Sequence, residues 1–325
     1  MTTEVLLDII EKSLSELGYA ELEPRALFEP IGYTLSLGGK RVRPLLCLLA
    51  CRLYSDNIAT ALPIARALEV FHNFTLLHDD LMDKSPIRRG QPTVYRKWND
   101  NTAILSGDAM SIEAYRSLEG IENPQLLFKV LPFFNKMAIE ICKGQQYDMD
   151  FEVREHVSVA EYIEMIRLKT AVLLGAALRL GALAAGAYDS DAQILDEVGQ
   201  ALGLAFQIQD DYLDVYGDEE TFGKPIGGDI MNGKKTLMLL YTQAKLERDD
   251  RAELDRLMKL GQEHKEERIS GVRRLYDKAG TPIYAQHEIE RLTQEALTKL
   301  RGLGLKQERL DPLYQLFDKL TTRKN

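Results

Sequence analysis

Two short segments of the sequence combine three aspartates with the end of a long apolar run. The trios are Asp79, Asp80 and Asp83 in LLHDDLMD, and Asp210, Asp211 and Asp214 in FQIQDDYLD. On a helix, the first and last aspartates of each trio lie four positions apart and share one face. Like charges at this spacing repel, and carboxylates at a helix C-terminus face the negative end of the helix dipole. A hard divalent cation removes both penalties, and magnesium suits such an oxygen-rich site.

A third acidic pair shows how an ordinary surface sequence differs. ERDDRAELD places Asp249 and Asp250 in the first turn of an expected helix, where the dipole favours carboxylates. Arg248 and Arg251 stand beside them. We interpret this pair as solvated surface, because it lacks the apolar approach and the helix-end position of the two trios.

Basic residues occur at turns beside the two trios. They are Lys40, Arg41 and Arg43 in GGKRVRP, Arg88 and Arg89 in DKSPIRRGQPT, Lys224 in GKP, and Lys234 and Lys235 in NGKKT. In such positions they are suited to hold phosphate groups. Metal, basic residues and an apolar helix together indicate a substrate with an anionic head and an apolar tail.

Helical periodicity dominates the regions that must position these residues. Apolar residues recur at spacings of three and four, and strand-like alternation is scarce. The expected helical runs are residues 57–83, 100–117, 122–149, 158–187, 189–216, 235–246 and 250–261. Turn signals separate them, and no linker-like composition divides the chain. We therefore predict an all-α fold, with residues 1–325 forming one domain built as a helical bundle.

The composition disfavours several classes of protein. The 325-residue chain has a formal net charge of −9, which argues against a general affinity for nucleic acid or for an anionic membrane. Its acidic, amphipathic N-terminal segment is neither a signal nor a transit peptide. The apolar stretch 171–187 is too short, and too rich in alanine and glycine, to be a transmembrane segment. Cys47, Cys51 and Cys142 fit packing thiols in a reducing compartment, so we expect a cytoplasmic protein.

Six segments, in this order, resemble the trans-prenyl diphosphate synthase (polyprenyl synthetase) family of the short-chain type: GGKRVRP, HDDLMDKSPIRRGQPT, GQQYD, LKTA, FQIQDDYLD and GKPIGGDIMNGKKT. The resemblance spans roughly residues 30–240, and the last eighty residues share only helical character. It implies the isoprenoid synthase fold, a single large helical bundle around a deep central apolar pocket, and usually a homodimer. It also implies a magnesium-dependent prenyltransferase of isoprenoid biosynthesis, which joins isopentenyl diphosphate head to tail to an allylic diphosphate.

The resemblance assigns roles toward the allylic diphosphate. Asp79, Asp83 and Asp210 would hold the magnesium ions, about three in number, that bridge it. Asp80, Asp211 and Asp214 would complete the acidic group, partly through water. Arg88, Lys169 and Lys224 would bind the diphosphate directly, and Asp148 and Lys234 would support the ions without touching them.

The resemblance also assigns the second substrate and the reacting carbons. Isopentenyl diphosphate would be held by Lys40, Arg43, His72 and Arg89, and Thr170 and Gln207 would flank the reacting carbons. Taken singly, His72 also fits a packed side chain, Lys169 a helix cap, and Asp148 a surface carboxylate.

The implied reaction is ionisation, condensation and elimination. The allylic substrate would be dimethylallyl, geranyl or farnesyl diphosphate. Neutralising the departing diphosphate lets the allylic carbon–oxygen bond ionise. The double bond of isopentenyl diphosphate, held close, attacks the carbocation, and a proton is then lost, with the departed diphosphate as the expected acceptor. The basic residues Arg323 and Lys324 are candidates to close over the site against water.

Side chains below Asp79 on its helix are expected to set the product length. Phe74 lies five residues earlier, about 7.5 Å along the helix, and Phe71 eight earlier, about 12 Å, whereas Thr75 at four earlier is small. In the family, an aromatic residue five before the motif limits products to around C15 or C20. We expect farnesyl or geranylgeranyl diphosphate, with C20 preferred. Alternatively, both phenylalanines are core residues and the floor lies elsewhere.

Two other functions fit the same motifs less well. A terpene cyclase shares the fold and an acidic metal site, but it needs neither GGKRVRP nor Arg89, which serve a second diphosphate, and aromatic residues make up only 8% of this chain. A non-catalytic partner subunit usually lacks the acidic motifs, and both are intact here. The sequence therefore favours catalysis.

Overall fold

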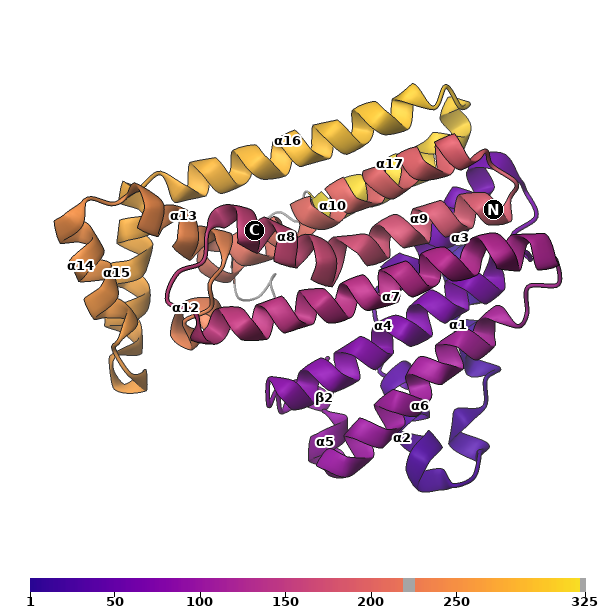
Figure 1. Cartoon of the computed structure of the whole chain (residues 1–325), viewed down its shortest axis with the longest axis horizontal. Coiled ribbons are helices and arrows are strands. Elements are labelled where there is room, and N and C mark those ends of the chain that lie inside the picture. Colours follow the sequence, from indigo (N-terminus) through magenta and orange to yellow (C-terminus); the bar gives the residue numbers. More distant parts are fainter. Residues whose placement is uncertain (219–225, 322–325) are drawn as a thin grey trace. The chain divides into compact units, whose positions relative to one another are not determined.

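The computed structural model describes residues 1–218 and 226–321. Lys224 and the basic residues Arg323 and Lys324 lie outside these ranges. Helices account for nearly all regular structure in the described residues, which confirms the all-α prediction (Figure 1). The exception there is a short antiparallel hairpin in which β1 (Ile87–Arg88) pairs with β2 (Gln91–Pro92). No helix in the described ranges combines the length and the apolar character that a membrane crossing requires.

The chain divides into two compact units. The first comprises Met1–Phe134, Ala176–Leu195 and Leu305–Leu313, and the second comprises Asn135–Gly175, Asp196–Gly304 and Tyr314–Asn325. Helices that contribute residues to both units are α7 (Pro124–Val153), α9 (Val172–Ala184), α10 (Asp189–Tyr216) and α17 (Gln307–Thr321).

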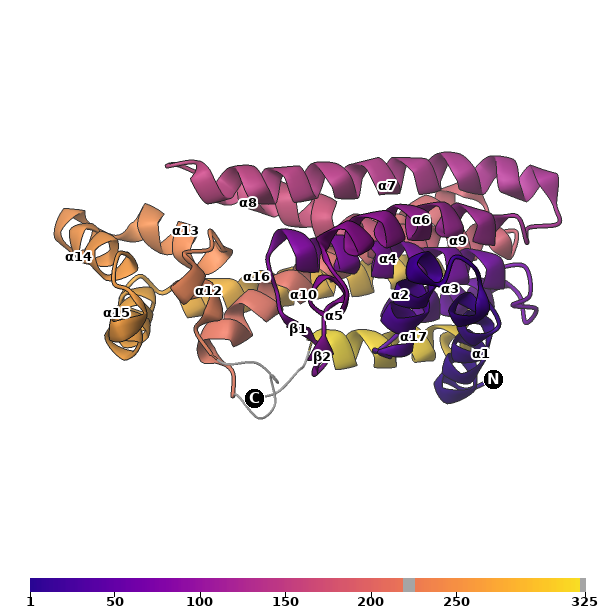
Figure 2. The ribbon, with the colours of Figure 1, turned by 90° about the horizontal axis from the view of Figure 1, so that it is seen from below.

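The first unit is built around α4, which carries the first acidic trio. Besides α4 (Leu62–Met82), its helices are α1 (Thr3–Ser15), η1 (Tyr19–Glu21), α2 (Arg25–Ser36), α3 (Val42–Tyr54), α5 (Val94–Lys97) and α6 (Asp100–Leu118). On α4, Ile64, Leu68 and Phe71 recur at spacings of four and three and are buried. Helix α6 runs alongside α4 in both views (Figures 1 and 2), and α3 also packs on it. This packing fixes the direction of α4 and therefore the position of the aspartates at its C-terminal end.

The second unit has its own apolar core. Its helices are α8 (Val159–Ile166), the π-helical turn η2 (Arg167–Ala171), α12 (Gly228–Asn232), α13 (Leu237–Lys245), α14 (Arg248–Met258), η3 (Gln262–His264), α15 (Lys265–Lys278) and α16 (Thr281–Gly302). Tyr162, Leu240, Leu275 and Ile289 belong to this core. Helices α14 and α15 pack side by side (Figure 2). As predicted, Asp250 lies in the first turn of α14.

Candidate functional site

The first acidic trio ends α4 in the first unit. The carbonyl of Asp79 accepts a hydrogen bond of 2.8 Å from the backbone N–H of Asp83, which closes the last turn. Asp80 is buried and accepts two hydrogen bonds of 2.8 Å from the Arg88 guanidinium. Desolvation raises the pKa of Asp80, and the bond from Arg88 opposes that rise. Arg88 is therefore held at the edge of the trio by a two-point contact.

The glycine-rich basic turn before α3 directs its cations differently. Gly39 and Arg41 both have positive φ, at 138° and 45°. The Arg41 residue is 3% exposed, and its side chain donates hydrogen bonds to Glu69 (2.8 Å), Glu11 (2.7 Å) and the carbonyl of Leu35 (2.7 Å). A non-glycine residue in the left-handed region costs roughly 1–2 kcal/mol, which these contacts offset. Arg41, grouped with the candidate phosphate ligands by its charge, instead anchors the turn.

Arg43, His72 and Arg89 interact electrostatically in the first unit, and we call these three residues the cationic cluster. A Cβ atom on Gly39 would lie 2.8 Å from the Arg89 guanidinium carbon, and Arg89 donates a hydrogen bond to the carbonyl of Gly38. Nε of Arg43 is buried and has no hydrogen-bond partner among the described residues. Desolvation lowers the pKa of Arg43 to about 10, and the positive charge of Arg89 adds to this effect. An anion bound here would stabilise the desolvated positive charges of Arg43 and Arg89.

The pKa of His72 is shifted by burial and by the same two arginines. Desolvation, followed by the positive charges of Arg43 and Arg89, lowers the pKa of His72 well below its ordinary value. The imidazole is therefore neutral at pH 7 and offers a hydrogen bond rather than a charge. Lys40 lies exposed on the adjacent turn. The first unit thus brings together the residues predicted to bind the second diphosphate.

The second acidic trio lies near the end of α10 in the second unit. The buried carboxylate of Asp211 accepts hydrogen bonds from the Tyr162 hydroxyl and from Nε2 of Gln207, the latter at 3.2 Å. The Gln207 carbonyl oxygen in turn accepts a hydrogen bond of 3.2 Å from the Thr170 hydroxyl. Thr170 and Gln207 are therefore linked by hydrogen bonds to Asp211 of the trio.

Asp214 faces α12 rather than Asp211. Its Oδ2 accepts a hydrogen bond of 3.0 Å from the backbone N–H of Asp229, and its carbonyl accepts one of 2.6 Å from Gly227. The Lys234 ammonium lies 3.9 Å from the carboxylate of Asp229. Desolvation opposes the charge on Lys234, but Asp229 and Asp211 outweigh it and raise the pKa of Lys234.

The prediction of one uninterrupted helix over residues 158–187 is wrong at its centre. The π-helical turn η2 interrupts it and carries Lys169 and Thr170. A Cβ atom on Gly144 of α7 would collide with the backbone at Lys169, so this glycine admits the bulged turn. The Lys169 ammonium donates a hydrogen bond of 2.6 Å to Asp148. The turn η2 thus carries both Lys169 and Thr170, and Asp148 fixes the position of the Lys169 ammonium.

Comparison with known proteins assigns the chain to a family. The polyprenyl synthetase family matches residues 24–276, which is most of the chain. The chain belongs to the polyprenyl synthetase family. It is 44% identical to the geranylgeranyl diphosphate synthase of Methanosarcina mazei over 67% of each chain. It is 42% identical to the geranylfarnesyl diphosphate synthase of Aeropyrum pernix, over 68% of this chain and 72% of that protein.

Solved structures of polyprenyl synthetases agree. A crystal structure of a geranylgeranyl pyrophosphate synthase superposes with a TM-score of 0.94 at 41% identity, covering 100% of both chains. The geranylgeranyl pyrophosphate synthase of Corynebacterium glutamicum, complexed with isoprenyl diphosphate and magnesium, superposes at 0.85 with 27% identity, covering 99% of this chain and 98% of that one. The chain is thus a short-chain trans-prenyltransferase with the isoprenoid synthase fold, as predicted, and the cyclase and non-catalytic alternatives are not favoured.

The aromatic side chains below Asp79 pack edge to face in the first unit of this polyprenyl synthetase. The ring centroid of Phe71 lies 5.3 Å from that of Phe74 and 5.6 Å from that of Phe134, all edge to face. Thr75 is turned toward the helix, because its hydroxyl donates a hydrogen bond of 2.8 Å to the carbonyl of His72. Phe71 is buried by this packing, whereas Phe74 is only partly buried. Phe74 is therefore the phenylalanine with accessible surface.

Two residues of the second unit were missed from the sequence. Tyr162 donates to Asp211, and Asp229 both contacts Asp214 and pairs with Lys234. Asp229 could have been found, because GGDIMNGKK places it five residues before Lys234. Tyr162 gave no signal, since it lies 49 residues from its partner in a helix whose other buried residues are apolar.

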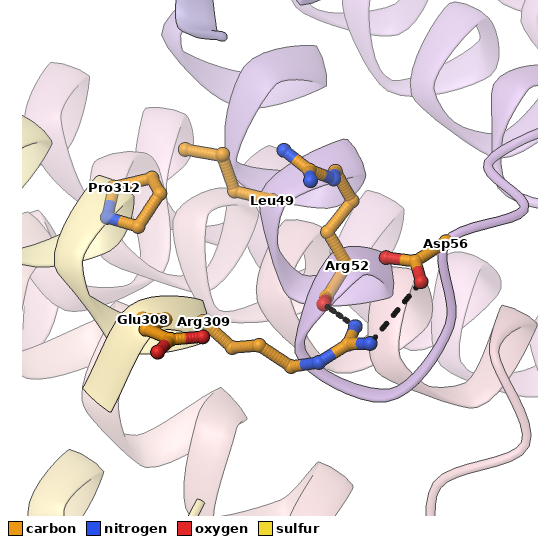
Figure 3. Close-up of a pocket in the computed structure, with 6 residues that line it drawn as sticks. All are labelled: Leu49, Arg52, Asp56, Glu308, Arg309 and Pro312. Carbon is orange, nitrogen blue, oxygen red and sulfur yellow. Dashed lines mark hydrogen bonds and ion pairs between the residues drawn. The ribbon is translucent and has the colours of Figure 1, made fainter. Parts of the chain in front are cut away.

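Two other polar features lie apart from the predicted roles. Lys235, grouped with the candidate phosphate ligands, donates a hydrogen bond to the carbonyl of Phe151 near the end of α7. A pocket of about 210 Å³ lies in the first unit. Figure 3 shows the residues that line it: Leu49, Arg52, Asp56, Glu308, Arg309 and Pro312. Arg309 spans it by donating to the carbonyl of Arg52 (2.6 Å) and to Asp56 (3.3 Å). None of the predicted site residues lines this pocket.

The acidic residues fit magnesium by the chemistry of their donors. Both trios offer carboxylate oxygens at helix ends, with no sulfur or nitrogen donor in either trio. Among the residues that the structure describes, no three acidic, histidine or cysteine side chains form a ready-made ion site. Magnesium often takes one or two carboxylates and completes its octahedron with water and phosphate oxygens. The trios suit that mode of binding.

The pH dependence of stability should reveal the charge on Asp211 in the metal-free protein. Desolvation, then the negative charge of Asp229, raises the pKa of Asp211 from 3.8 to about 7. The folded state therefore binds a proton more tightly than the unfolded state, and Asp211 destabilises the fold increasingly as pH rises from 3.8 through 7. We expect Asp211→Asn to raise the melting temperature of the metal-free protein at about pH 8, and to do so less at about pH 5. Thermal unfolding in chelator at both pH values measures this, and an equal effect at both would contradict it.

Proposed function

We propose that this chain condenses isopentenyl diphosphate with allylic diphosphates, and that geranylgeranyl diphosphate is its main product. The cationic cluster carries this proposal. It offers a buried donor at Arg43 Nε beside a second arginine, in the same unit as the first acidic trio. A cyclase ionises one diphosphate and needs no such second site. The M. mazei relative, named as a geranylgeranyl diphosphate synthase, supports the choice of product.

We assign the two acidic trios to magnesium and the allylic diphosphate. Asp79, Asp83 and Asp210 would be the direct ligands of about three ions, while Arg88 and Lys169 would bind the diphosphate oxygens. Support comes from the oxygen-only donor sets and from the magnesium and isoprenyl diphosphate bound to the C. glutamicum relative. When bound, magnesium neutralises the charge that develops on the departing diphosphate. We further propose that the two units act as one catalytic domain.

The chain's own residues would then carry the remaining steps. Arg88, held by Asp80, is oriented toward its ligand before substrate arrives, so little reorganisation is needed. The Thr170 hydroxyl and the Gln207 amide line the space for the allylic carbons, where their dipoles stabilise positive charge. The cationic cluster would hold isopentenyl diphosphate so that its double bond meets the carbocation. The allylic carbon–oxygen bond breaks first, the new carbon–carbon bond then forms between the carbocation and that double bond, and the proton lost passes to the departed diphosphate.

Phe74 should limit the length of the product. Phe74→Ala opens a space of roughly one five-carbon unit below Asp79, so we expect the main product to shift from C20 to C25 or longer. Chromatography of the dephosphorylated products after reaction with labelled isopentenyl diphosphate measures the shift. Phe317→Ala, which removes a buried phenylalanine of α17, is the control and should leave the product length unchanged. An unchanged product from Phe74→Ala would place the floor elsewhere.

A homodimer should form through α6. Ile104, Leu105, Ile112 and Tyr115 lie on one face of this helix, and Leu105 and Ile112 are 60% and 61% exposed. We expect Ile112→Glu to give a mass near 36.8 kDa by light scattering, where the unaltered protein shows twice that. Ile283→Glu, at an exposed residue of α16, should leave the dimer intact. A monomeric unaltered protein would rule the dimer out.

Product analysis of the purified chain tests the function as a whole. The protein is incubated with magnesium, labelled isopentenyl diphosphate and each primer in turn: dimethylallyl, geranyl and farnesyl diphosphate. We expect every primer to be extended to C20. Consumption of an allylic diphosphate without incorporation of isopentenyl diphosphate would instead indicate a cyclase. We place this activity in the cytoplasm, which the three free cysteines support.

A further inference from the structure

Arg268 lies on α15, outside every segment that the sequence analysis assigned. It is 7% exposed, and within the described residues no carboxylate pairs with it and its Nε has no hydrogen-bond partner. A buried arginine without a counter-charge is unfavourable for stability, and an apolar side chain of similar volume would pack at less cost. Packing alone therefore does not explain an arginine at this position.

The remaining donors of Arg268 reach two backbone carbonyls. Nη2 donates to the carbonyl of Ile230 in α12 at 2.6 Å, and Nη1 donates to that of Leu260, just beyond α14, at 2.7 Å. A Cβ atom on Gly233, the residue that caps α12, would lie 3.9 Å from Nη2. The guanidinium thus sits at the C-terminal end of α12, where the Ile230 carbonyl also accepts a hydrogen bond of 3.1 Å from the backbone N–H of Gly233 and where a cation is favoured.

Helix α15 also contacts the other end of α12. A Cβ atom on Gly227 would lie 2.5 Å from Cδ1 of Ile269, which directly follows Arg268. Gly227 and Gly233 both have positive φ and bound a helix of only five residues. A helix this short has no stability of its own, so its position depends on what it packs against.

Asp229 lies in the first turn of α12, and Lys234 directly follows its C-terminal cap, Gly233. Both residues interact with the second acidic trio. At the first end, the backbone N–H of Asp229 donates to Asp214. At the other, the backbone N–H of Lys234 donates to the carbonyl of Asp229 at 2.9 Å, and the Lys234 ammonium approaches the Asp229 carboxylate. A shift of α12 would therefore move a carboxylate and an ammonium together.

We propose that Arg268 is a positioning residue for the metal–diphosphate site. By holding the end of α12, it fixes Asp229 and Lys234 against Asp211 and Asp214, and so sets the affinity for magnesium with diphosphate. This inference rests on the proposed assignment of the second trio to magnesium. It places a determinant of the active site in a part of the chain whose sequence showed only helical character.

Hydrogen exchange of the metal-free protein gives the first test. In Arg268→Met, we expect the amides of residues 227–234 to exchange at least about 10-fold faster, with α10 and α16 unchanged. The melting temperature should stay within about 3 °C of the unaltered protein, because methionine fills the buried space. Arg274→Met, at an exposed arginine of the same helix, is the matched control and should change neither quantity.

Titration with magnesium and inorganic pyrophosphate gives the second test. By calorimetry, Arg268→Met should weaken magnesium–pyrophosphate binding about 10-fold, as expected for loss of a residue that orients a metal ligand. Arg268→Lys, which keeps a donor near Ile230, should recover part of that loss. The KM for isopentenyl diphosphate should change less than about twofold, since Arg268 acts on the second trio alone.

Asp229→Asn in the same titration separates two failures. If Asp229→Asn weakens binding but Arg268→Met does not, the positioning role is wrong while the metal assignment stands. If neither variant weakens binding, the assignment of this trio is wrong and the inference fails with it. A fall in melting temperature in Arg268→Met with unchanged exchange and binding would also overturn it, because the arginine would then serve stability only.

Discussion

We expect Asp79→Asn to lower kcat by about 10³-fold or more at saturating magnesium and substrates. Asparagine keeps the size of the side chain and one oxygen, but it lacks the negative charge that would hold a cation beside the departing diphosphate. The loss therefore appears when the allylic carbon–oxygen bond ionises, rather than in substrate binding. Single-turnover kinetics with geranyl diphosphate and isopentenyl diphosphate measure that step directly.

The control for this variant is Asp249→Asn. Asp249 belongs to the acidic pair in the first turn of α14, which we interpret as surface, so its replacement should leave kcat unchanged. Circular dichroism and thermal unfolding establish that both variants fold. If Asp79→Asn keeps kcat within about twofold, Asp79 is not a metal ligand. The assignment of the aspartate trios to magnesium would then lose its main support.

We expect Arg43→Met to lower kcat/KM for isopentenyl diphosphate by about 10²-fold or more, as when one partner of a desolvated charge pair is removed. The KM for the allylic substrate should stay within about twofold, because we assign the cationic cluster to the second diphosphate alone. Steady-state kinetics with each substrate varied in turn give both constants. The contrast between them is the signature of this site.

The stability of Arg43→Met should move in the opposite direction to its activity. Nε of Arg43 has no partner among the described residues, and desolvation outweighs the favourable charge of Glu69 and lowers the pKa of Arg43, so the positive charge is on balance unfavourable in the folded protein. We expect a melting temperature equal to or above that of the unaltered protein. Arg25→Met, at an exposed arginine of α2, should change neither kinetics nor stability. Equal effects of Arg43→Met on both KM values would refute the division of the two sites.

The helices could be predicted from the sequence because their signal is local. The run 100–117 became α6 (Asp100–Leu118), and 189–216 became α10 with the same bounds, since apolar spacing of three and four already defines a buried face. Long-range packing overrode this signal at η2. There, Gly144 of α7 lets the backbone at Lys169 approach closely, and no periodicity in residues 158–187 reveals that approach.

The sequence also predicted which charged residues belong to the site, but not which partner each of their side chains contacts. GGKRVRP presents Arg41 and Arg43 as equals. The structure turns Arg41 inward to Glu69, 28 residues away, and leaves Arg43 Nε without a partner in the described residues. Likewise, Asp80 looks like its neighbours until Arg88 binds both of its oxygens. Side-chain direction depends on partners that are distant in the chain, and spacing does not encode them.

By itself, the sequence determined that this protein is all-helical, that it is a prenyltransferase, and which aspartates and basic residues are available for diphosphate chemistry. The helices and the available charged groups follow from residue types at helical spacing, whereas the prenyltransferase class follows from the resemblance of six segments to a known family. The tertiary structure alone decided which charges are satisfied internally, where the helix bulges to present Lys169, and that Arg268 on α15 holds the short helix bearing Asp229. Burial makes each unpaired donor or charge costly, so its final partner is chosen by the packing of remote segments rather than by its neighbours in sequence.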